Sequence, residues 1–140
     1  MSFLEAAGMA LYRKELLKEI CDVGLTLAGD DGWRELLNGI DSSGKIKFLG
    51  WINNRTELPK LYNATKINLN ITQSQSKIVF NMRVFDIAGC RAFMLTDYRR
   101  DLEELFGMEG KAISYLDKKD LCNRADYYLN HPEERKELVV

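Results

Sequence analysis

Two hydrophobic spacings alternate along this 140-residue chain, and each predicts a different kind of secondary structure. Residues 3–20 place apolar side chains at helical intervals, with charged side chains on the opposite side, which predicts an amphipathic helix. Short apolar runs bounded by glycine or polar residues predict buried strands instead. We expect strands at 23–28, 46–49, 67–71, 92–96 and 112–115. We expect further helices at 33–37, from 56, at 80–90, at 101–106, at 117–130 and from 132.

Strands that alternate with helices predict a Rossmann-like α/β fold, in which a sheet of five parallel strands carries helices on both faces. Such sheets bind ligands at the carboxyl ends of their strands. Gly29, Gly50, the polar loop 73–77 and the pair at 96–97 each follow a predicted strand. We therefore expect these positions to share one edge of the sheet.

An acidic residue interrupts the helix predicted at 80–90. Val84 and Ile87 belong to its apolar stripe, and Asp86 lies between them. A carboxylate buried there needs a partner, because burying it alone costs several kcal/mol. One interpretation is an ion pair with Arg83, three residues earlier. Another is a ligand, because one carboxylate can accept hydrogen bonds from both hydroxyl groups of a ribose. The residues themselves leave both interpretations open.

Composition describes a globular protein and excludes two classes of function. Apolar residues make up 46% and charged residues 29%, with a net charge of -1. This balance excludes a disordered tail and a strongly basic surface, so we expect no nucleic-acid partner. The N-terminus lacks the pattern of a signal peptide, and no apolar run approaches the roughly 20 residues of a membrane span. We expect a cytoplasmic protein without a transmembrane segment.

The residue types that bind metals are scattered. The three cysteines, Cys21, Cys90 and Cys122, are far apart and form no CxxC pair. The single histidine, His131, precedes a proline where a helix is expected to end, which predicts a surface position. We therefore expect free thiols and no metal site.

The stretch NMRVFDIAGCRAFMLTDYRRDLEELF, residues 81–106, resembles the donor-binding C-terminal half of GT-B glycosyltransferases. The resemblance is to the bacterial group described as spore-maturation or glycosyl transferases group 1 proteins. Four further motifs follow the order of that group and extend the resemblance over nearly the whole chain: GDDGW at 29–33, KFLGWI at 47–52, LPKLYNATKINLN at 58–70 and YYLNHPEER at 127–135.

The resemblance implies a nucleotide-sugar donor, with UDP the commonest nucleotide in the group, and no metal cofactor. It places the ribose hydroxyl groups on Asp86. The other implied contacts are the diphosphate at Asn81, Met82, Arg83 and Gly29, the base at Gly50, Trp51 and Ile52, and the sugar at Gln73, Ser74 and Lys77. Free N–H groups and the helix dipole at the start of the 80–90 helix favour an anion there.

Each implied contact has a simpler interpretation. Arg83 can serve only as the partner of Asp86, and Trp51 can be a packing residue. Asp30 can be a plain helix cap. The loop with Gln73, Ser74 and Lys77 can simply be solvated.

Two departures from the GT-B pattern affect the prediction. Retaining families carry two glutamates eight positions apart, whereas this chain has Ile78 and Asp86, so the catalytic residue and the stereochemical outcome stay unknown. The small turn that usually reads Ala-Cys-Gly is Gly89, Cys90 and Arg91 here.

The chain also lacks parts that the resemblance would include. A GT-B donor half normally begins with one more strand, and a complete enzyme has an acceptor-binding domain before it. We therefore expect residues 1–140 to be a single donor-binding domain excised from a two-domain glycosyltransferase, and inactive without its N-terminal acceptor-binding partner.

Two other classes of function fit an α/β chain. A receiver-like signalling domain would use Asp30, Asp31 and Thr96, but Ile71, Thr72 and Gln73 stand where its phosphoacceptor aspartate belongs. A partner-binding α/β module without a ligand is the other alternative. Titration with nucleotides distinguishes all three.

Overall fold

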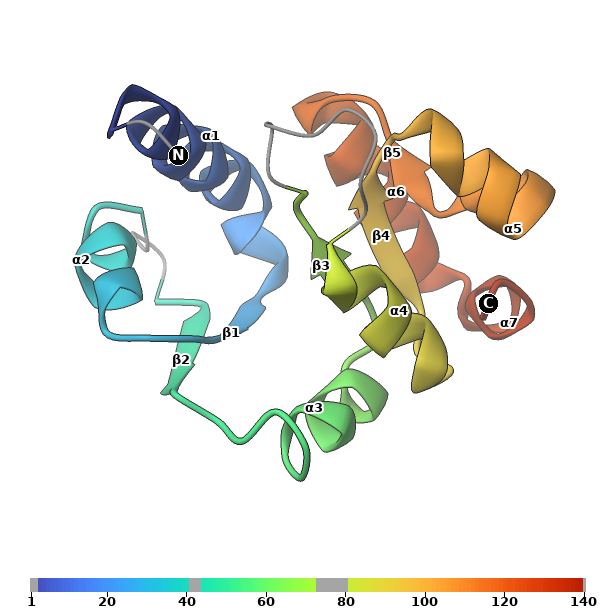
Figure 1. Cartoon of the computed structure of the whole chain (residues 1–140), viewed down its shortest axis with the longest axis horizontal. Helices are drawn as coiled ribbons and strands as arrows, with labels where there is room; N and C mark the ends of the chain where they lie inside the picture. The colour runs from blue at the N-terminus through green and yellow to red at the C-terminus, as the bar shows by residue number, and fades with distance from the viewer. Residues whose placement is uncertain (1–2, 41–43, 73–80, 140) are drawn as a thin grey trace. The chain divides into compact units, whose positions relative to one another are not determined.

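The computed structural model describes residues 3–40, 44–72 and 81–139, in two compact units, Met1–Asn54 and Arg55–Val140. Five strands are described, and every strand pair is parallel. Helices accompany the strands in both units (Figure 1). The predicted α/β class with parallel strands is confirmed. We call the units the N-terminal unit and the C-terminal unit.

The N-terminal unit contains a two-stranded sheet. In chain order its elements are α1 (Phe3–Ile20), the 3-10 helix η1 (Cys21–Val23), β1 (Leu25–Ala28), α2 (Gly32–Asn38) and β2 (Ile46–Gly50). Leu25 pairs with Ile46 and Leu27 with Phe48. The apolar side chains that it buries are Leu16, Leu17, Ile20, Leu37 and Ile40.

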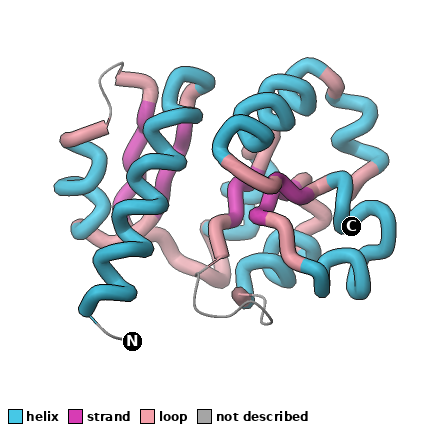
Figure 2. The backbone as a smooth tube through the Cα atoms, turned by 90° about the horizontal axis from the view of Figure 1, so that it is seen from above, coloured by secondary structure: helices cyan, strands magenta, loops and turns pink. Residues whose placement is uncertain are grey.

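The C-terminal unit contains a three-stranded sheet in the order β3–β4–β5, with β4 in the middle. Figure 2 shows strands in magenta and helices in cyan. Its elements are α3 (Leu58–Ala64), β3 (Asn68–Asn70), α4 (Met82–Gly89), β4 (Met94–Asp97), α5 (Arg100–Ala112), β5 (Ser114–Tyr115), α6 (Lys118–Asn130) and α7 (Pro132–Glu137). Phe93, Leu95 and Tyr115, which lie in apolar runs that predicted buried strands, are buried. Trp33 of the N-terminal unit, also expected in the core, is only half-buried. A continuous apolar run suits β4 because a central parallel strand is covered on both faces.

Among the described residues, the five parallel strands are hydrogen-bonded as a pair in the N-terminal unit and as a set of three in the C-terminal unit. Thr26 of β1 and Lys47 of β2 are exposed, so the N-terminal sheet has a solvated face. Strands inside a parallel sheet are instead buried on both faces. The alternation in LTLA and IKFLG carried this signal.

Two glycines mark the boundaries of elements. Gly24 has a φ of 85° and follows the 3-10 helix, and β1 begins after it at Leu25 and not at 23. Gly107 has a φ of 60° and a ψ of -138°, which are not helical, so the first helical segment of α5 ends near the predicted boundary at 106. A second helical segment continues to Ala112 and leaves β5 only two residues, fewer than predicted.

Candidate functional site

Polar side chains occupy the carboxyl ends of β3 and β4 in the C-terminal unit. β3 ends in Asn70 and β4 in Thr96 and Asp97, and Asn70 is the register partner of Thr96. Asn70 is 0% exposed and Thr96 is 1% exposed. Parallel strands bring these ends together, as the sequence predicted for positions 96 and 97. Buried polar groups require hydrogen-bond partners, and these residues supply them to one another.

A chain of hydrogen bonds joins the strand ends to the start of α4. Nδ2 of Asn81 donates to Oδ1 of Asn70 at 2.9 Å, and Nδ2 of Asn70 donates to Oγ1 of Thr96 at 3.0 Å. The Thr96 hydroxyl lies 3.4 Å from Oδ1 of Asp97. The Tyr115 hydroxyl donates to the backbone oxygen of Asn70 at 3.4 Å. We call Asn70, Asn81, Thr96 and Asp97 the strand-end network.

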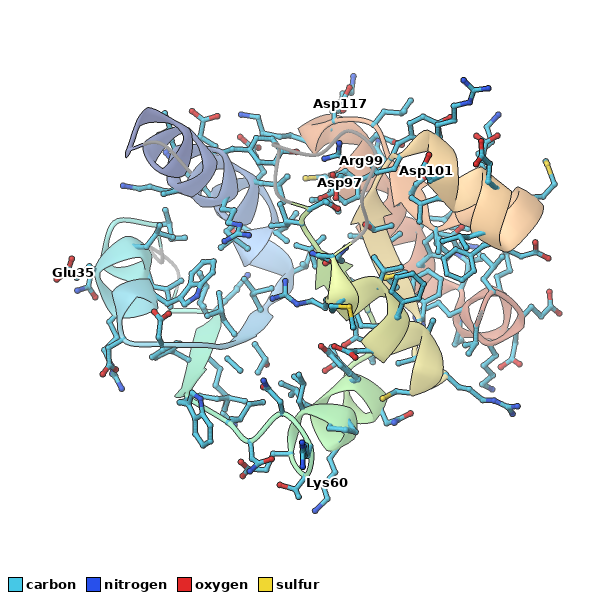
Figure 3. All side chains as sticks on the ribbon, in the orientation of Figure 1. Glu35, Lys60, Asp97, Arg99, Asp101 and Asp117 are labelled. Carbon is cyan, nitrogen blue, oxygen red and sulfur yellow. The ribbon has the colours of Figure 1, made fainter. Side chains whose placement is uncertain are left out.

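Asp97 is anchored from both sides of its carboxylate. Oδ1 accepts the backbone N–H of Thr72 at 2.8 Å, which ties the residue after β3 to the end of β4. Oδ2 accepts Nε of Arg99 at 3.2 Å and Nη2 at 3.1 Å. The two side chains lie together beside the end of β4 (Figure 3). Their side chains are only 17% and 14% exposed, so water screens this ion pair less than a surface pair.

The start of α4 faces the same edge. Asn81 precedes the helix in an extended conformation, with φ -75° and ψ 154°, but its side chain makes no capping hydrogen bond. The side chain contacts Asn70 instead. Helix starts leave N–H groups without intrahelical acceptors, so Met82 and Arg83 present donors there. Met82 is 73% exposed.

Asp86 lies on the exposed face of α4, so the expectation of a buried carboxylate is wrong. The helix buries Val84 and Ile87 and exposes Arg83 and Asp86. Because an exposed carboxylate needs no partner, burial gives no reason for an ion pair. Among the residues that the structure describes, no ion pair joins Arg83 to Asp86.

Tyr62 of α3 shares this region with α4, and sequence reasoning missed it. Burial raises the pKa of its hydroxyl, the nearby Arg83 guanidinium lowers it, and the charges of Asp86 and Cys90 raise it. The tyrosine is 7% exposed. Its position in the apolar pattern of LPKLYNATKINLN was the signal, but that pattern predicted only packing.

The predicted site residues of the N-terminal unit gather at the carboxyl ends of β1 and β2. The N–H of Gly29 donates to the backbone oxygen of Gly50 at 3.0 Å. A Cβ at Gly29 would lie 2.5 Å from Cδ1 of Trp33, so this indole requires a glycine. Gly50 has a φ of 74°. The turn therefore uses the two glycines for different reasons.

Trp51 is 75% exposed, which contradicts its interpretation as a packing residue. Ile52 is half-buried beside it. Asp30 accepts the N–H of Gly32, the first residue of α2, through Oδ1 at 3.0 Å. The N-cap position itself is Asp31, whose side chain makes no capping hydrogen bond. Gln73, Ser74, Lys77 and Ile78 lie outside the described residues.

The remaining candidates for chemistry have structural partners. His131 is exposed, and its ring stacks on that of Tyr127 with 4.0 Å between the ring centroids. Its Nδ1 lies 2.7 Å from the Tyr127 backbone oxygen. Cys90 and Cys122 are free thiols, as predicted. The described part of the chain holds no group of three or more metal-ligating side chains.

Comparison with known proteins identifies the family. A profile described as glycosyl transferase-like matches residues 12–139. The chain belongs to this family. It is also 45% identical over 61 residues to the spore protein CgeB of Bacillus subtilis strain 168. That match covers 44% of this chain but 18% of CgeB. No solved structure gives a significant match.

Membership in the glycosyl transferase-like family favours a transferase over the receiver-like alternative, whose phosphoacceptor is missing. None of the helices within the described ranges is long and apolar enough to cross a membrane.

Proposed function

We propose that this chain is the donor-binding half of a glycosyltransferase and binds a nucleotide sugar, with UDP as the nucleotide. The observation that carries the proposal is the start of α4 at the carboxyl edge of the C-terminal sheet, joined to it by the Asn81–Asn70 hydrogen bond, in a chain of the glycosyl transferase-like family. A helix start favours the negative charge of a diphosphate. We assign the diphosphate to the N–H groups of Asn81 and Met82 and to the charge of Arg83.

Asp86 is the proposed ligand of the ribose hydroxyl groups. It lies one helical turn after Arg83 on the same exposed face of α4, where a bound molecule can reach both. In the N-terminal unit, Gly29 is assigned to the phosphates and Gly50, Trp51 and Ile52 to the base. An exposed indole offers an apolar face to a base. Gln73, Ser74 and Lys77 are assigned to the sugar from the resemblance alone.

The binding site for the acceptor would lie in a domain outside this chain. The match to CgeB covers 18% of that protein's length, which agrees with a donor half that belongs to a longer protein. We place the full-length protein in the cytoplasm, because the proteins that it resembles use nucleotide-sugar donors there.

Calorimetric titration of the chain with UDP, GDP, ADP and UDP-glucose tests the proposal. We expect UDP to bind most tightly, and Asp86→Ala to weaken it by about 1.5 to 3 kcal/mol, the range for a hydrogen bond to a charged group. The melting temperature of the variant should stay near that of the wild type, because Asp86 is exposed.

Asp126→Ala is the matched control, because Asp126 is an exposed aspartate on α6. It should leave the affinity for UDP unchanged. Equal affinities in Asp86→Ala and wild type would remove Asp86 from the site, and failure of every nucleotide to bind would remove the proposed function.

A further inference from the structure

The charge of Asp97 determines which side chain donates and which accepts in each hydrogen bond of the strand-end network. An ionised carboxylate only accepts hydrogen bonds, so the Thr96 hydroxyl at 3.4 Å donates to it. Thr96 Oγ1 is then an acceptor, and the group that Asn70 presents to it at 3.0 Å must be Nδ2. The reverse direction would turn the Thr96 proton toward a neutral amide and away from the charged carboxylate.

The same reasoning fixes the orientation of Asn81. Once Nδ2 of Asn70 faces Thr96, its Oδ1 faces Asn81 and can only accept. Asn81 therefore turns its Nδ2 toward Asn70, at 2.9 Å. Its own Oδ1 points elsewhere, is buried, and has no hydrogen-bond partner among the described residues. It is the buried side-chain oxygen that the network leaves unsatisfied.

An unsatisfied buried acceptor costs free energy, so it requires an explanation. The explanation must be a hydrogen-bond donor. Phosphate oxygens of a nucleoside diphosphate sugar carry no proton near neutral pH, so the anion expected at the start of α4 does not satisfy this atom. The hydroxyl groups of the same ligand do.

We propose that the Asn81 side chain determines donor specificity by accepting a hydrogen bond from a sugar hydroxyl group. The inference rests on the proposed function and adds a role to Asn81 beyond its backbone N–H. The hydroxyl belongs either to the ribose or to the transferred sugar. Because the oxygen is closed to solvent in the unliganded chain, neighbouring atoms move when the hydroxyl binds. Thr96 acts as a positioning residue that keeps the acceptor turned outward.

The experiment measures ratios of dissociation constants by calorimetry, so that effects common to all ligands cancel. The ratio for 2′-deoxy-UDP over UDP reports the ribose, and the ratio for UDP over UDP-glucose reports the transferred sugar. Wild type should show a ratio above one for at least one pair. In Asn81→Ala that ratio should fall by roughly 2- to 10-fold, the range of one neutral hydrogen bond.

Two variants keep the test interpretable. Asn81→Ser retains a residue favoured at a helix start and serves if Asn81→Ala fails to fold. It should lower the ratio in the same way, because its side chain is too short to make both contacts. Asn63→Ala is the matched control, since Asn63 is an exposed asparagine on α3 bonded to a backbone oxygen. It should leave both ratios unchanged.

Thr96 tests the direction of the network. Thr96→Val removes the hydroxyl at nearly constant volume and frees Asn70 to turn, so the affected ratio should fall. Thr96→Ser keeps the hydroxyl and should retain the wild-type ratio. Nucleotide binding by wild type with both ratios unchanged in Asn81→Ala overturns this inference alone. Failure of the wild-type chain to bind any nucleotide overturns the proposed function and this inference with it.

Discussion

Arg91 shows how one residue can depart from a family's pattern without changing the local structure. The Arg91 N–H donates to Ala88 O at 2.9 Å and the Ala92 N–H to Ile87 O at 3.2 Å, which is the Schellman arrangement at the end of α4. Arg91 has a φ of 52°, the left-handed conformation for which this position favours glycine. The turn that usually reads Ala-Cys-Gly therefore persists with an arginine in place of the glycine.

We predict that Arg91→Gly stabilises the chain. The left-handed conformation costs a residue with a Cβ about 1–2 kcal/mol, and glycine removes this cost. Part of the gain is lost again, because glycine loses more conformational entropy on folding. We expect the free energy of unfolding to rise by about 0.5–1 kcal/mol in a urea titration. Arg91→Ala is the control, because alanine removes the guanidinium and keeps the Cβ. An equal gain in both variants would assign the effect to charge and not to backbone conformation.

Gly110 is constrained by its neighbours. A Cβ there would lie 2.1 Å from the backbone oxygen of Leu102, because the second part of α5 folds back against the first after the kink at Gly107. A contact with backbone cannot be relieved by a side-chain rotation. Gly110 and Gly107 thus produce the shape of α5 together.

We predict that Gly110→Ala lowers the free energy of unfolding by about 1–3 kcal/mol, the usual cost of overpacking. Gly89→Ala is the matched control: a Cβ at Gly89 meets nothing within 4 Å, and alanine favours a helix. Thermal melts of the two variants should move in opposite directions. A neutral Gly110→Ala would mean that α5 is straighter than described.

At the scale of elements, Asp97 connects β4 to the residue after β3. Its carboxylate binds the Thr72 N–H and the Arg99 guanidinium, and both groups would lose this charged acceptor without it. We predict that Asp97→Ala destabilises the C-terminal unit by about 2–3 kcal/mol, since the hydrogen bonds go to a charged group that is largely buried.

The measurement is a chemical denaturation curve, with Asp101→Ala as the control on the neighbouring helix. Asp97→Asn should recover part of the loss, because its side-chain oxygen can still accept from Thr72. A loss below 0.5 kcal/mol, the size of a surface substitution, would contradict a connecting role for Asp97.

The sequence predicted the secondary-structure elements better than it predicted which side chains contact one another. Within the described residues, periodicity located the strands and the α-helices but not the 3-10 helix η1, because burial sets the spacing of apolar residues. It misjudged Asp86, since an acidic residue between Val84 and Ile87 lies on the opposite face of a helix from both. It placed 96 and 97 at the sheet edge but missed the hydrogen bonds of the strand-end network. Asn70 is ordinary in sequence, and only the parallel register of β3 and β4 brings it beside Thr96, while the start of α4 brings Asn81 to it.

At the scale of the molecule, each sheet taken by itself has an edge strand without a described partner on its outer side. Within the described residues β1 pairs only with β2, and β3 pairs only with β4. Unpaired edges favour pairing with further strands, and natural proteins usually cover them.

The final prediction concerns activity, because the proposed donor half contains no acceptor site. Glycosyl transfer joins two substrates, and holding both in the reactive geometry supplies much of the rate of such reactions. We therefore expect the 140-residue chain to bind UDP-glucose and to release no UDP above the background of a protein-free reaction. Coupled detection of UDP in the presence of a mixture of sugar acceptors measures this.

The calorimetric titration is the control for folding, since an inactive chain that still binds nucleotide is a competent donor half. Turnover near or above 1 s⁻¹, within the range of ordinary enzymes, would show that these residues hold both substrates and that the division into donor and acceptor halves is wrong. Activity that appears only when the remainder of the full-length protein is added would instead assign the acceptor to that remainder.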